Sequence, residues 1–254
     1  MLQLQALLDA DLGNANRRVN AKAPLVEERL PFTLRVVSNE ADLWKAVQIR
    51  HAAYSRHVPD FAATLARPEA TDFEDGVAVL LAESRLDGAP LGTMRIQTNR
   101  YKPLSLEQSL TLPDWLQGRP LAEATRLGIT EERVGRVVKT ALFKAYFQFC
   151  AEDGVDWMVI AGRSPIDRQY ERLMFKDVYP GQGFIPLRHA GNMPHRVMAL
   201  QVSQVEPTWR QASHPLYDYF FRTRHVDIDA SPVMARDDGR VASPWEHDAV
   251  LATQ

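Results

Sequence analysis

The chain has 254 residues, of which 45% are hydrophobic and 24% charged, a composition typical of one soluble domain that needs no disulfide or metal. The single cysteine excludes an intrachain disulfide, and the seven histidines lack metal-ligand spacing. A net charge of −2 argues against a dedicated nucleic-acid-binding protein, and no apolar run reaches membrane-spanning length. We therefore expect a cytoplasmic protein with no metal, nucleic-acid partner or transmembrane segment.

The two ends of the chain differ in pattern from its middle. Residues 1–31 are predicted to be a leader, with a short amphipathic helix and then a polar connector that runs from Gly13 to Glu28. Residues 237–254 are polar and are predicted to be a C-terminal tail. Residues 32–236 remain as the predicted folded domain.

The domain is predicted to begin with a strand, a helix and a hairpin. Phe32–Val37 alternates as a strand, and Asn39 is a suitable N-cap for a helix that runs to about Ser55. Val77–Ser84 and Leu91–Thr98 have strand patterns and are joined by an Asp-Gly turn, which is a hairpin signal.

The second half is predicted to alternate strands and helices. Leu121–Ile129 is a strand, Val134–Cys150 a long helix and Val155–Ala161 a buried strand. A helix is predicted to open with Ser164 as its N-cap, and Arg196–Val202 is a last strand. The whole order predicts an α/β (α+β) fold with one mixed sheet and helices on both faces.

Two charged residues occur in rows that are otherwise apolar. Arg50 shares a helical stripe with Leu43, Val47 and Tyr54, so it either meets an anion or reaches water at the edge of the stripe. Glu123 lies on the apolar face of its strand, where an unpaired carboxyl would have a raised pKa. Arg126 would share that face only if a β-bulge turned it there.

A set of polar residues follows a recognisable order along the chain. Its members are Arg50, Tyr54, Asp72, Asp75, Arg95, Glu123, Thr125 and Arg126. The order resembles that of acyl-homoserine-lactone synthases, which have an arginine and an aromatic residue in the first helix and two aspartates three apart. They continue with an arginine on a strand near a glycine and a Glu-x-Ser/Thr-Arg motif.

From about Leu43 to Val202, the chain is most similar to the related long-chain N-acyl amino acid synthases. Both families are similar to the GNAT acyltransferases in fold and use acyl carrier protein as donor. The resemblance therefore implies a GNAT-like mixed central sheet and an acyltransferase without a bound cofactor.

The resemblance also implies roles for individual residues. Glu123 would be the general base, directly or through water, and Tyr170 would protonate the departing thiolate. The alternatives are an ion pair between Glu123 and Arg95, and a tyrosine that only packs in the core. The other residues of the set would bind substrate.

The start of the long helix bears on the choice of donor. GNAT enzymes that use coenzyme A have small residues where this chain has Arg136 and Val138, so a cradle for pyrophosphate is not expected. The expected donor is the acyl-phosphopantetheine of acyl carrier protein. Arg133, Arg136, Lys139 and Lys144 would dock this acidic protein, the alternative being an ordinary solvated helix face.

The acceptor is expected to be a free amino acid, since no tryptophan lies between Lys45 and Asp114 to stack on an adenine ring and Phe61 is the only aromatic residue between Tyr54 and Asp72. The main hypothesis is thus an N-acyl amino acid synthase. One alternative is a homoserine-lactone synthase that uses S-adenosylmethionine. The other is a catalytically silent module that binds carrier protein or lipid and regulates a partner.

Overall fold

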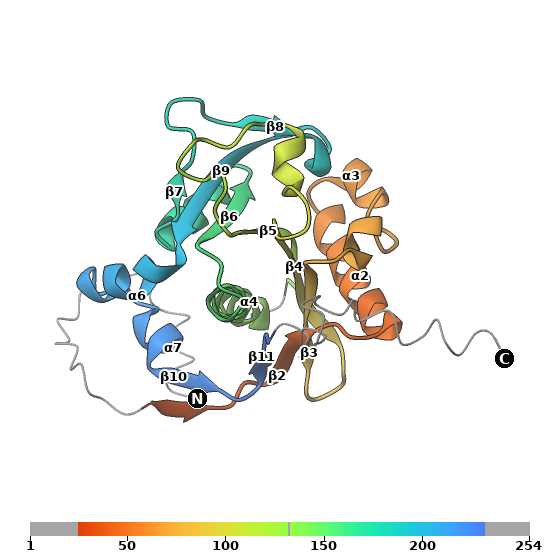
Figure 1. Ribbon diagram of the computed structural model, residues 1–254. Coiled ribbons are helices and arrows are strands. Elements are labelled where there is room, and N and C mark those ends of the chain that lie inside the picture. Colours follow the sequence, from red (N-terminus) through yellow and green to blue (C-terminus); the bar gives the residue numbers. More distant parts are fainter. Residues whose placement is uncertain (1–24, 132, 232–254) are drawn as a thin grey trace.

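The computed structural model describes residues 25–131 and 133–231, and a mixed sheet forms its centre (Figure 1). Neighbouring strands are antiparallel from β2 to β5, β5 and β6 are parallel, and β6 and β9 are antiparallel again. The strand order is β11 (Ile228–Asp229), β2 (Phe32–Val36), β3 (Val77–Ser84), β4 (Pro90–Thr98), β5 (Leu121–Ile129), β6 (Trp157–Gly162), β9 (Met193–Gln201) and β7 (Lys176–Asp177), with β8 (Ile185–Leu187) also paired to β9.

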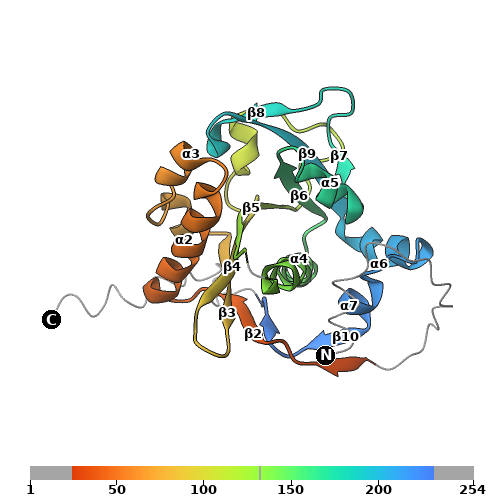
Figure 2. The ribbon, with the colours of Figure 1, turned by 180° about the vertical axis from the view of Figure 1, so that it is seen from behind.

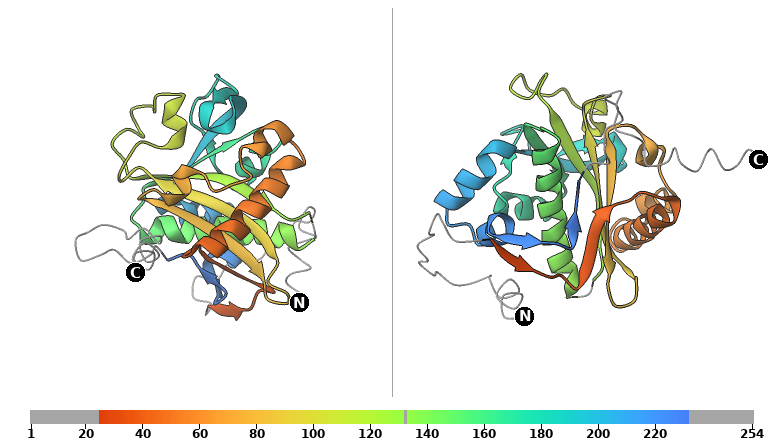
Figure 3. Two further views of the ribbon diagram at one scale, coloured as in Figure 1. Left: turned by 90° about the vertical axis from the view of Figure 1, so that its right-hand side faces the viewer. Right: turned by 60° about the horizontal axis from the view of Figure 1, so that its bottom comes forward.

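Helices cover both faces of this sheet, as the sequence predicts (Figures 1 and 2). One face carries α2 (Glu40–Ser55) and α3 (Pro59–Ala63), and the other carries α4 (Val134–Glu152), as the side view shows (Figure 3). Asn39 caps α2 through its Oδ1 atom, which accepts the N–H of Asp42 at 2.9 Å. The predicted N-cap is therefore confirmed.

The parallel strands β5 and β6 part before they end. Their pairing runs from Leu121 and Trp157 to Ala124 and Ile160, and β5 then continues to Ile129 without β6 beside it. Beyond that point, Met94 of β4 faces two residues of β5, which is a β-bulge. A fork between two strands and a bulge on one of them thus lie side by side.

The bulge places Arg126 in the left-handed region, with φ of 55°. Such a backbone conformation is uncommon for a residue with a side chain and persists only where the surroundings hold it. The bulge turns Arg126 to the face of the sheet that Glu123 occupies, which strict alternation would not do.

Several predicted boundaries differ from the structure. The helix after β6 is α5 (Asp167–Arg172), with Ile166 at its N-cap and no side-chain cap, so the predicted cap at Ser164 is wrong. The predicted polar connector contains β1 (Val26–Glu28), which pairs in parallel with β10 (Thr223–His225). The predicted leader helix lies outside the described residues, as does the predicted tail.

The segment after β9 forms a small lobe that the sequence pattern did not predict. It contains α6 (Val202–Gln211) and α7 (Tyr217–Phe221), followed by β10 and β11. Aromatic side chains from both helices pack beside α4, and Trp209 and Phe220 belong to the main core. Because the sheet covers one side of α4 and this lobe another, α4 is buried on most of its circumference.

No helix in residues 25–131 and 133–231 is long and apolar enough to cross a membrane. Within the same ranges, no group of three or more histidine, cysteine or acidic side chains is arranged to hold a metal ion.

Candidate active site

A cluster of buried charges lies between α2 and the sheet. Arg50 of α2 is fully buried and donates to both carboxylate oxygens of Asp72, at 2.9 and 3.0 Å. Asp72 belongs to η1 (Ala70–Phe73), a single turn of 3₁₀ helix. Of the two interpretations of Arg50, the one in which it meets an anion is therefore confirmed.

Glu69 joins two further arginines to this pair. It accepts from Arg126 at 2.6 and 2.7 Å, and from Arg50 and Arg95 at 3.1 Å each. Arg95 also donates to Asp72 at 3.2 Å. Glu69 is thus the acid that all three guanidinium groups share, and the sequence pattern did not single it out.

The acidic pair of the cluster is shifted by three residues from the predicted one. Glu69 and Asp72 are three apart and both bind arginine, whereas Asp75 is exposed and lies outside the cluster. Asp75 therefore does not join Asp72 in binding arginine, and the substrate-binding role of both aspartates stays a prediction. Both pairs, Glu69 with Asp72 and Asp72 with Asp75, are three residues apart, so the spacing along the chain does not distinguish them.

The cluster holds three guanidinium groups against two carboxylates, so it carries an excess of positive charge. Burial by itself would raise the pKa of Glu69 and of Asp72, but bonds and charge from the arginines hold both below their usual values. Both acids therefore stay ionised. Among the three arginine side chains, Arg126 is the most exposed at 5%, against 2% for Arg95 and 0% for Arg50.

Glu123 lies on β5 next to this cluster and is fully buried. Its Oε2 atom accepts the backbone N–H of Leu106 at 3.1 Å, from η2 (Ser105–Gln108). Burial raises its pKa to about 7, although that N–H and the charges of Arg95 and Arg126 act in the opposite direction. A carboxyl of this kind changes its charge near neutral pH.

The alternative role for Glu123, an ion pair with Arg95, does not occur in the structure. The Arg95 guanidinium bonds to Glu69 and Asp72, and its Nε atom donates to Thr125 Oγ1 at 3.2 Å. Arg95 acts on Glu123 only through its charge. Thr125 is a predicted substrate-binding residue. In the structure its hydroxyl accepts a hydrogen bond from Arg95 and so holds that arginine in place.

Two aromatic residues close the cluster on the side of α2 and α3. Tyr54 is half-buried and packs on Phe61, with ring centroids 5.9 Å apart. The guanidinium carbon of Arg126 lies 5.3 Å from the centre of the Phe61 ring. Gly191 also packs on that ring, since a Cβ at this position would come within 2.9 Å of it.

Tyr170 of α5 is buried in the core on the α4 side of the sheet. Its ring lies 5.8 Å from that of Phe143 and 6.4 Å from that of Phe175, between centroids. Burial raises its pKa, and the nearby Tyr54 and Asp167 add to this effect. The core packing expected of a purely structural tyrosine is therefore present. The raised pKa also keeps the phenol protonated, which is the state that a proton donor to a thiolate needs.

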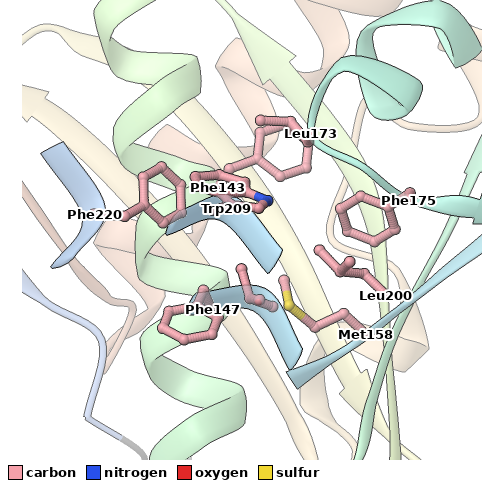
Figure 4. A pocket seen from close by; sticks show the side chains of 9 residues that line it. Phe143, Phe147, Met158, Leu173, Phe175, Leu200, Trp209 and Phe220 are labelled. Atoms are coloured by element: carbon pink, nitrogen blue, oxygen red, sulfur yellow. The ribbon is translucent and has the colours of Figure 1, made fainter. Parts of the chain in front are cut away.

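An apolar pocket lies beside Tyr170, between α4, β6, β9 and the C-terminal lobe (Figure 4). The side chains in Figure 4 point toward a common space, and Phe143 and Phe175 are the two that also contact Tyr170. The only nitrogen among them is Trp209 Nε1, which has no hydrogen-bond partner within the described ranges. The lining residues are Phe143, Phe147, Met158, Leu173, Phe175, Leu200, Val205, Trp209 and Phe220.

The four cations predicted to dock a carrier protein have different surroundings. Arg133 and Arg136 are exposed at the start of α4, and Lys139 is half-buried and donates to Gln169. Lys144 is 1% exposed, and its Nζ atom donates to the carbonyl oxygens of Tyr219 and Thr223 at 2.8 and 2.6 Å. The predicted docking role of Lys144 is therefore wrong, because the C-terminal lobe covers it.

No protein-family model matches the chain, and no curated protein sequence matches it. Solved structures do resemble it. FeeM, an N-acyl amino acid synthase from uncultured soil microbes, has 17% sequence identity and a TM-score of 0.53, over 74% of this chain and 96% of FeeM.

BjaI is a second similar structure, a CoA-dependent acyl-homoserine lactone synthase solved with SAM and isopentyl-CoA. It has 14% identity and a TM-score of 0.50, over 76% of this chain and 93% of BjaI. At these identities the likeness concerns the fold. The chain has a GNAT-like fold.

Proposed function

We propose that the protein is an N-acyltransferase that moves a fatty acyl group from acyl carrier protein to the amine of a free amino acid. One observation carries the proposal. Glu123, a fully buried carboxyl whose pKa is raised to about 7, lies on the strand of a GNAT-like sheet that parts from its parallel neighbour. A carboxyl tuned in this way is suited to take a proton from an amine near neutral pH.

The proposed reaction forms an amide bond and breaks a thioester bond. Glu123 takes a proton from the ammonium of the acceptor, and the free amine then attacks the thioester carbonyl. The tetrahedral intermediate collapses to the amide and releases the thiolate of phosphopantetheine. Tyr170, whose phenol keeps its proton at neutral pH, protonates that thiolate. The amide nitrogen loses its remaining extra proton to solvent, and solvent returns a proton to Tyr170.

The charged cluster supports an amino acid as acceptor. Its excess positive charge suits a carboxylate, and Arg126 is the guanidinium that a carboxylate would reach first, because Arg50 and Arg95 are more deeply buried. This differs from the sequence-based hypothesis, in which Arg95 binds the carboxylate. Arg95 already binds the carboxylates of both Glu69 and Asp72, whereas Arg126 binds that of Glu69 alone.

The surroundings of Phe61 argue against S-adenosylmethionine as acceptor. An adenine ring would need an open aromatic face to stack on. The Phe61 ring is contacted by Arg126, by Tyr54 and by the backbone at Gly191. These contacts leave it poorly placed for adenine.

The apolar lining beside Tyr170 supports a fatty acyl group as the transferred unit. In this structure the pocket has room for about one water molecule, so a hydrocarbon chain would enter it only as the uncharged lining side chains move apart. At the start of α4, Val138 stands where the enzymes that use coenzyme A have a small residue, and it is buried with its side chain packed against β4 at Gly92. The exposed Arg133 and Arg136 suit an acidic carrier protein.

The proposal is tested by product analysis with the purified protein. It is incubated with palmitoyl-loaded or decanoyl-loaded acyl carrier protein, or with the matching acyl-CoA, in the presence of twenty amino acids or of S-adenosylmethionine. N-acyl amino acid from the carrier-protein reaction is the expected product. Acyl-homoserine lactone as the only product would show the alternative synthase, and equal rates from acyl-CoA would overturn the choice of donor.

Absence of any product in every incubation would leave the silent module as the explanation. In that case the protein would still bind acyl carrier protein or acyl chains. Binding is measured on the same samples by isothermal calorimetry. If product does form, the Glu123→Gln variant is the control, because it should lose activity and keep binding.

A further inference from the structure

His189 lies against Glu123, in a loop that the sequence pattern did not indicate. Its Nε2 atom is 3.3 Å from Glu123 Oε1, and its side chain is 8% exposed. It belongs to η3 (Arg188–Ala190), which packs against η2, the turn whose Leu106 N–H bonds to the other oxygen of Glu123. Two short turns thus enclose the carboxyl from two sides.

The backbone of His189 is tied to the charged cluster as well. Its carbonyl oxygen accepts from Arg126 Nη2 at 2.8 Å, and the N–H of Arg188 donates to Ser109 Oγ at 2.8 Å. Gly191 ends the turn with φ of 67° and packs on Phe61. The imidazole is therefore held by a loop that is anchored on both sides.

Two polar atoms of this pair have unused hydrogen-bonding capacity. Glu123 Oε1 and His189 Nδ1 are buried and have no hydrogen-bond partner in residues 25–131 and 133–231. The Nε2 and Oε1 atoms are close, but they are not aligned for a hydrogen bond. Hydrogen bonds of catalytic groups are often long or misaligned without substrate and tighten when it binds.

Charged and titratable groups from every neighbouring element act on the pair. They are Arg95 of β4, Arg126 of β5, Tyr146 of α4, His195 of β9 and, through Arg126, Glu69 before η1. Burial, Arg126, His195 and Arg95 lower the pKa of His189 to about 4, although an interaction with the backbone of Ser105 acts in the opposite direction. At neutral pH the imidazole is thus uncharged and has one N–H to donate.

We propose that His189 is a positioning residue that donates its Nε2 hydrogen to Oε1 of ionised Glu123. The inference rests on the proposed function, in which Glu123 is the base. The proton of the acceptor's ammonium goes to Glu123, which changes from carboxylate to carboxylic acid, while His189 neither gains nor loses a proton. The hydrogen bond stabilises the charged form of a carboxyl that burial otherwise keeps neutral.

Removal of this donor should raise the pKa of the base. In His189→Leu, we expect the acidic limb of the kcat/KM profile to move up from its wild-type position by about one pH unit or more, since a hydrogen bond to a charged group is lost. The loss of activity should be roughly tenfold at pH 7 and small at pH 9. His189→Gln, which keeps a donor at a similar position, should restore most of the profile. A purely structural role would lower the rate equally at all pH values and would overturn the proposal.

A second measurement does not depend on activity. The ¹⁵N and ¹H signals of the His189 ring, assigned by their loss in His189→Gln, should shift near pH 7 in the wild type as Glu123 ionises, and should not shift in Glu123→Gln. The exposed His57 provides a reference signal. Ring signals that ignore Glu123 would overturn the inference whatever the activity. A normal titration without any acylated product would support the pair and refute the proposed function.

Discussion

The two faces of the central sheet bury opposite kinds of side chain around the same pair of strands. On the α2 face, Arg50, Arg126 and Glu123 belong to an interior of charges, and on the α4 face Phe143 and Phe147 line a pocket without charge. The proposed formation of a fatty amide would need both faces, the first for a charged amine and the second for a hydrocarbon chain. Under that proposal, the fork between β5 and β6 would join the two substrates.

The tyrosines at this fork support that interpretation. Tyr54 belongs to the α2 face and Tyr170 to the helix that follows β6, yet Tyr54 contributes to the raised pKa of Tyr170, after the larger effect of burial. An electrostatic interaction thus links the two faces of the sheet. Under the proposed function, a thioester beside Tyr170 would have the amine on one side and its own acyl chain on the other.

The largest expected effect comes from removing the base on the charged face. In Glu123→Gln we expect turnover to fall by roughly two to four orders of magnitude, because Gln keeps the shape of the side chain but cannot take a proton. Steady-state kinetics with the loaded carrier protein at pH 7.5 measure this loss. Glu83→Gln is the matched control, because Glu83 of β3 is paired with Arg35 of β2 and Lys45 of α2 and lies outside the candidate site. Unchanged turnover in a folded Glu123→Gln would remove Glu123 from the mechanism.

Much of the charged face follows from the sequence, because an arginine or a glutamate in an apolar row requires an explanation. This reasoning singles out Arg50 and Glu123, and it makes a bulge the condition for bringing Arg126 to the same face, which the structure contains. Glu69 was not separated from the other acids of its loop, since a 3₁₀ turn decides which acids point inward. His189 lies in a short turn without periodic pattern, so nothing in its neighbourhood on the chain marked it.

The lobe beside the apolar face was missed for a different reason. Lys144 looks like an exposed docking residue because the carbonyl groups that bind it come from Tyr219 and Thr223, 75 and 79 residues further along the chain. Short elements such as α7 and β10 give weak local signals. The pattern along a helix shows which positions repeat, but it does not show that a second layer covers the remaining side.

The same glutamate should make the protein less stable as the pH rises. Its pKa in the folded protein, about 7, exceeds its usual value of 4.5, so it contributes stability in full below about pH 4.5 and loses it as the pH rises through 7. At pH 8 the ionised group should cost about 3 kcal/mol of unfolding free energy, as an upper estimate. Glu123→Gln cannot ionise and avoids this cost.

Denaturant unfolding of wild type and Glu123→Gln at pH 4, 6 and 8 measures the effect. The difference in unfolding free energy should change in favour of the variant as the pH rises, and most of the change should fall between pH 4.5 and 7.5. Glu83→Gln again serves as control. A difference that stays constant with pH would show that the buried carboxyl is not held in its protonated form.

On the apolar face, a larger pocket should change the preferred acyl chain. Phe220 lines the pocket and contacts Trp209 rather than Tyr170, so Phe220→Leu should leave the reacting end undisturbed. For a donor whose acyl chain is two carbons longer than the one the wild type prefers, we expect kcat/KM of the variant to rise about tenfold over that of the wild type. The reason is that each buried methylene contributes about 0.8 kcal/mol. Phe221→Leu is the control, since Phe221 is its neighbour but does not line the pocket. An equal shift in both variants would show that this pocket does not determine which acyl chain length is preferred.

The smallest effect is expected where the donor would dock, outside both faces. Arg133 and Arg136 are exposed near the N-terminal end of α4, so Arg133→Glu/Arg136→Glu should not reduce stability, and acids near a helix N-terminus are favourable. The KM for loaded carrier protein should rise roughly two- to fivefold per reversed charge, and the effect should shrink in 0.5 M salt. Arg119→Glu is the control, because Arg119 is exposed, precedes the start of β5 and has its guanidinium 4.0 Å from Asp156. Stopped-flow or steady-state assays at low and high salt with acyl carrier protein, and with acyl-CoA in parallel, decide the matter. A KM that rises equally for both donors would place the two arginines at the phosphate of the donor rather than at the surface of the carrier protein.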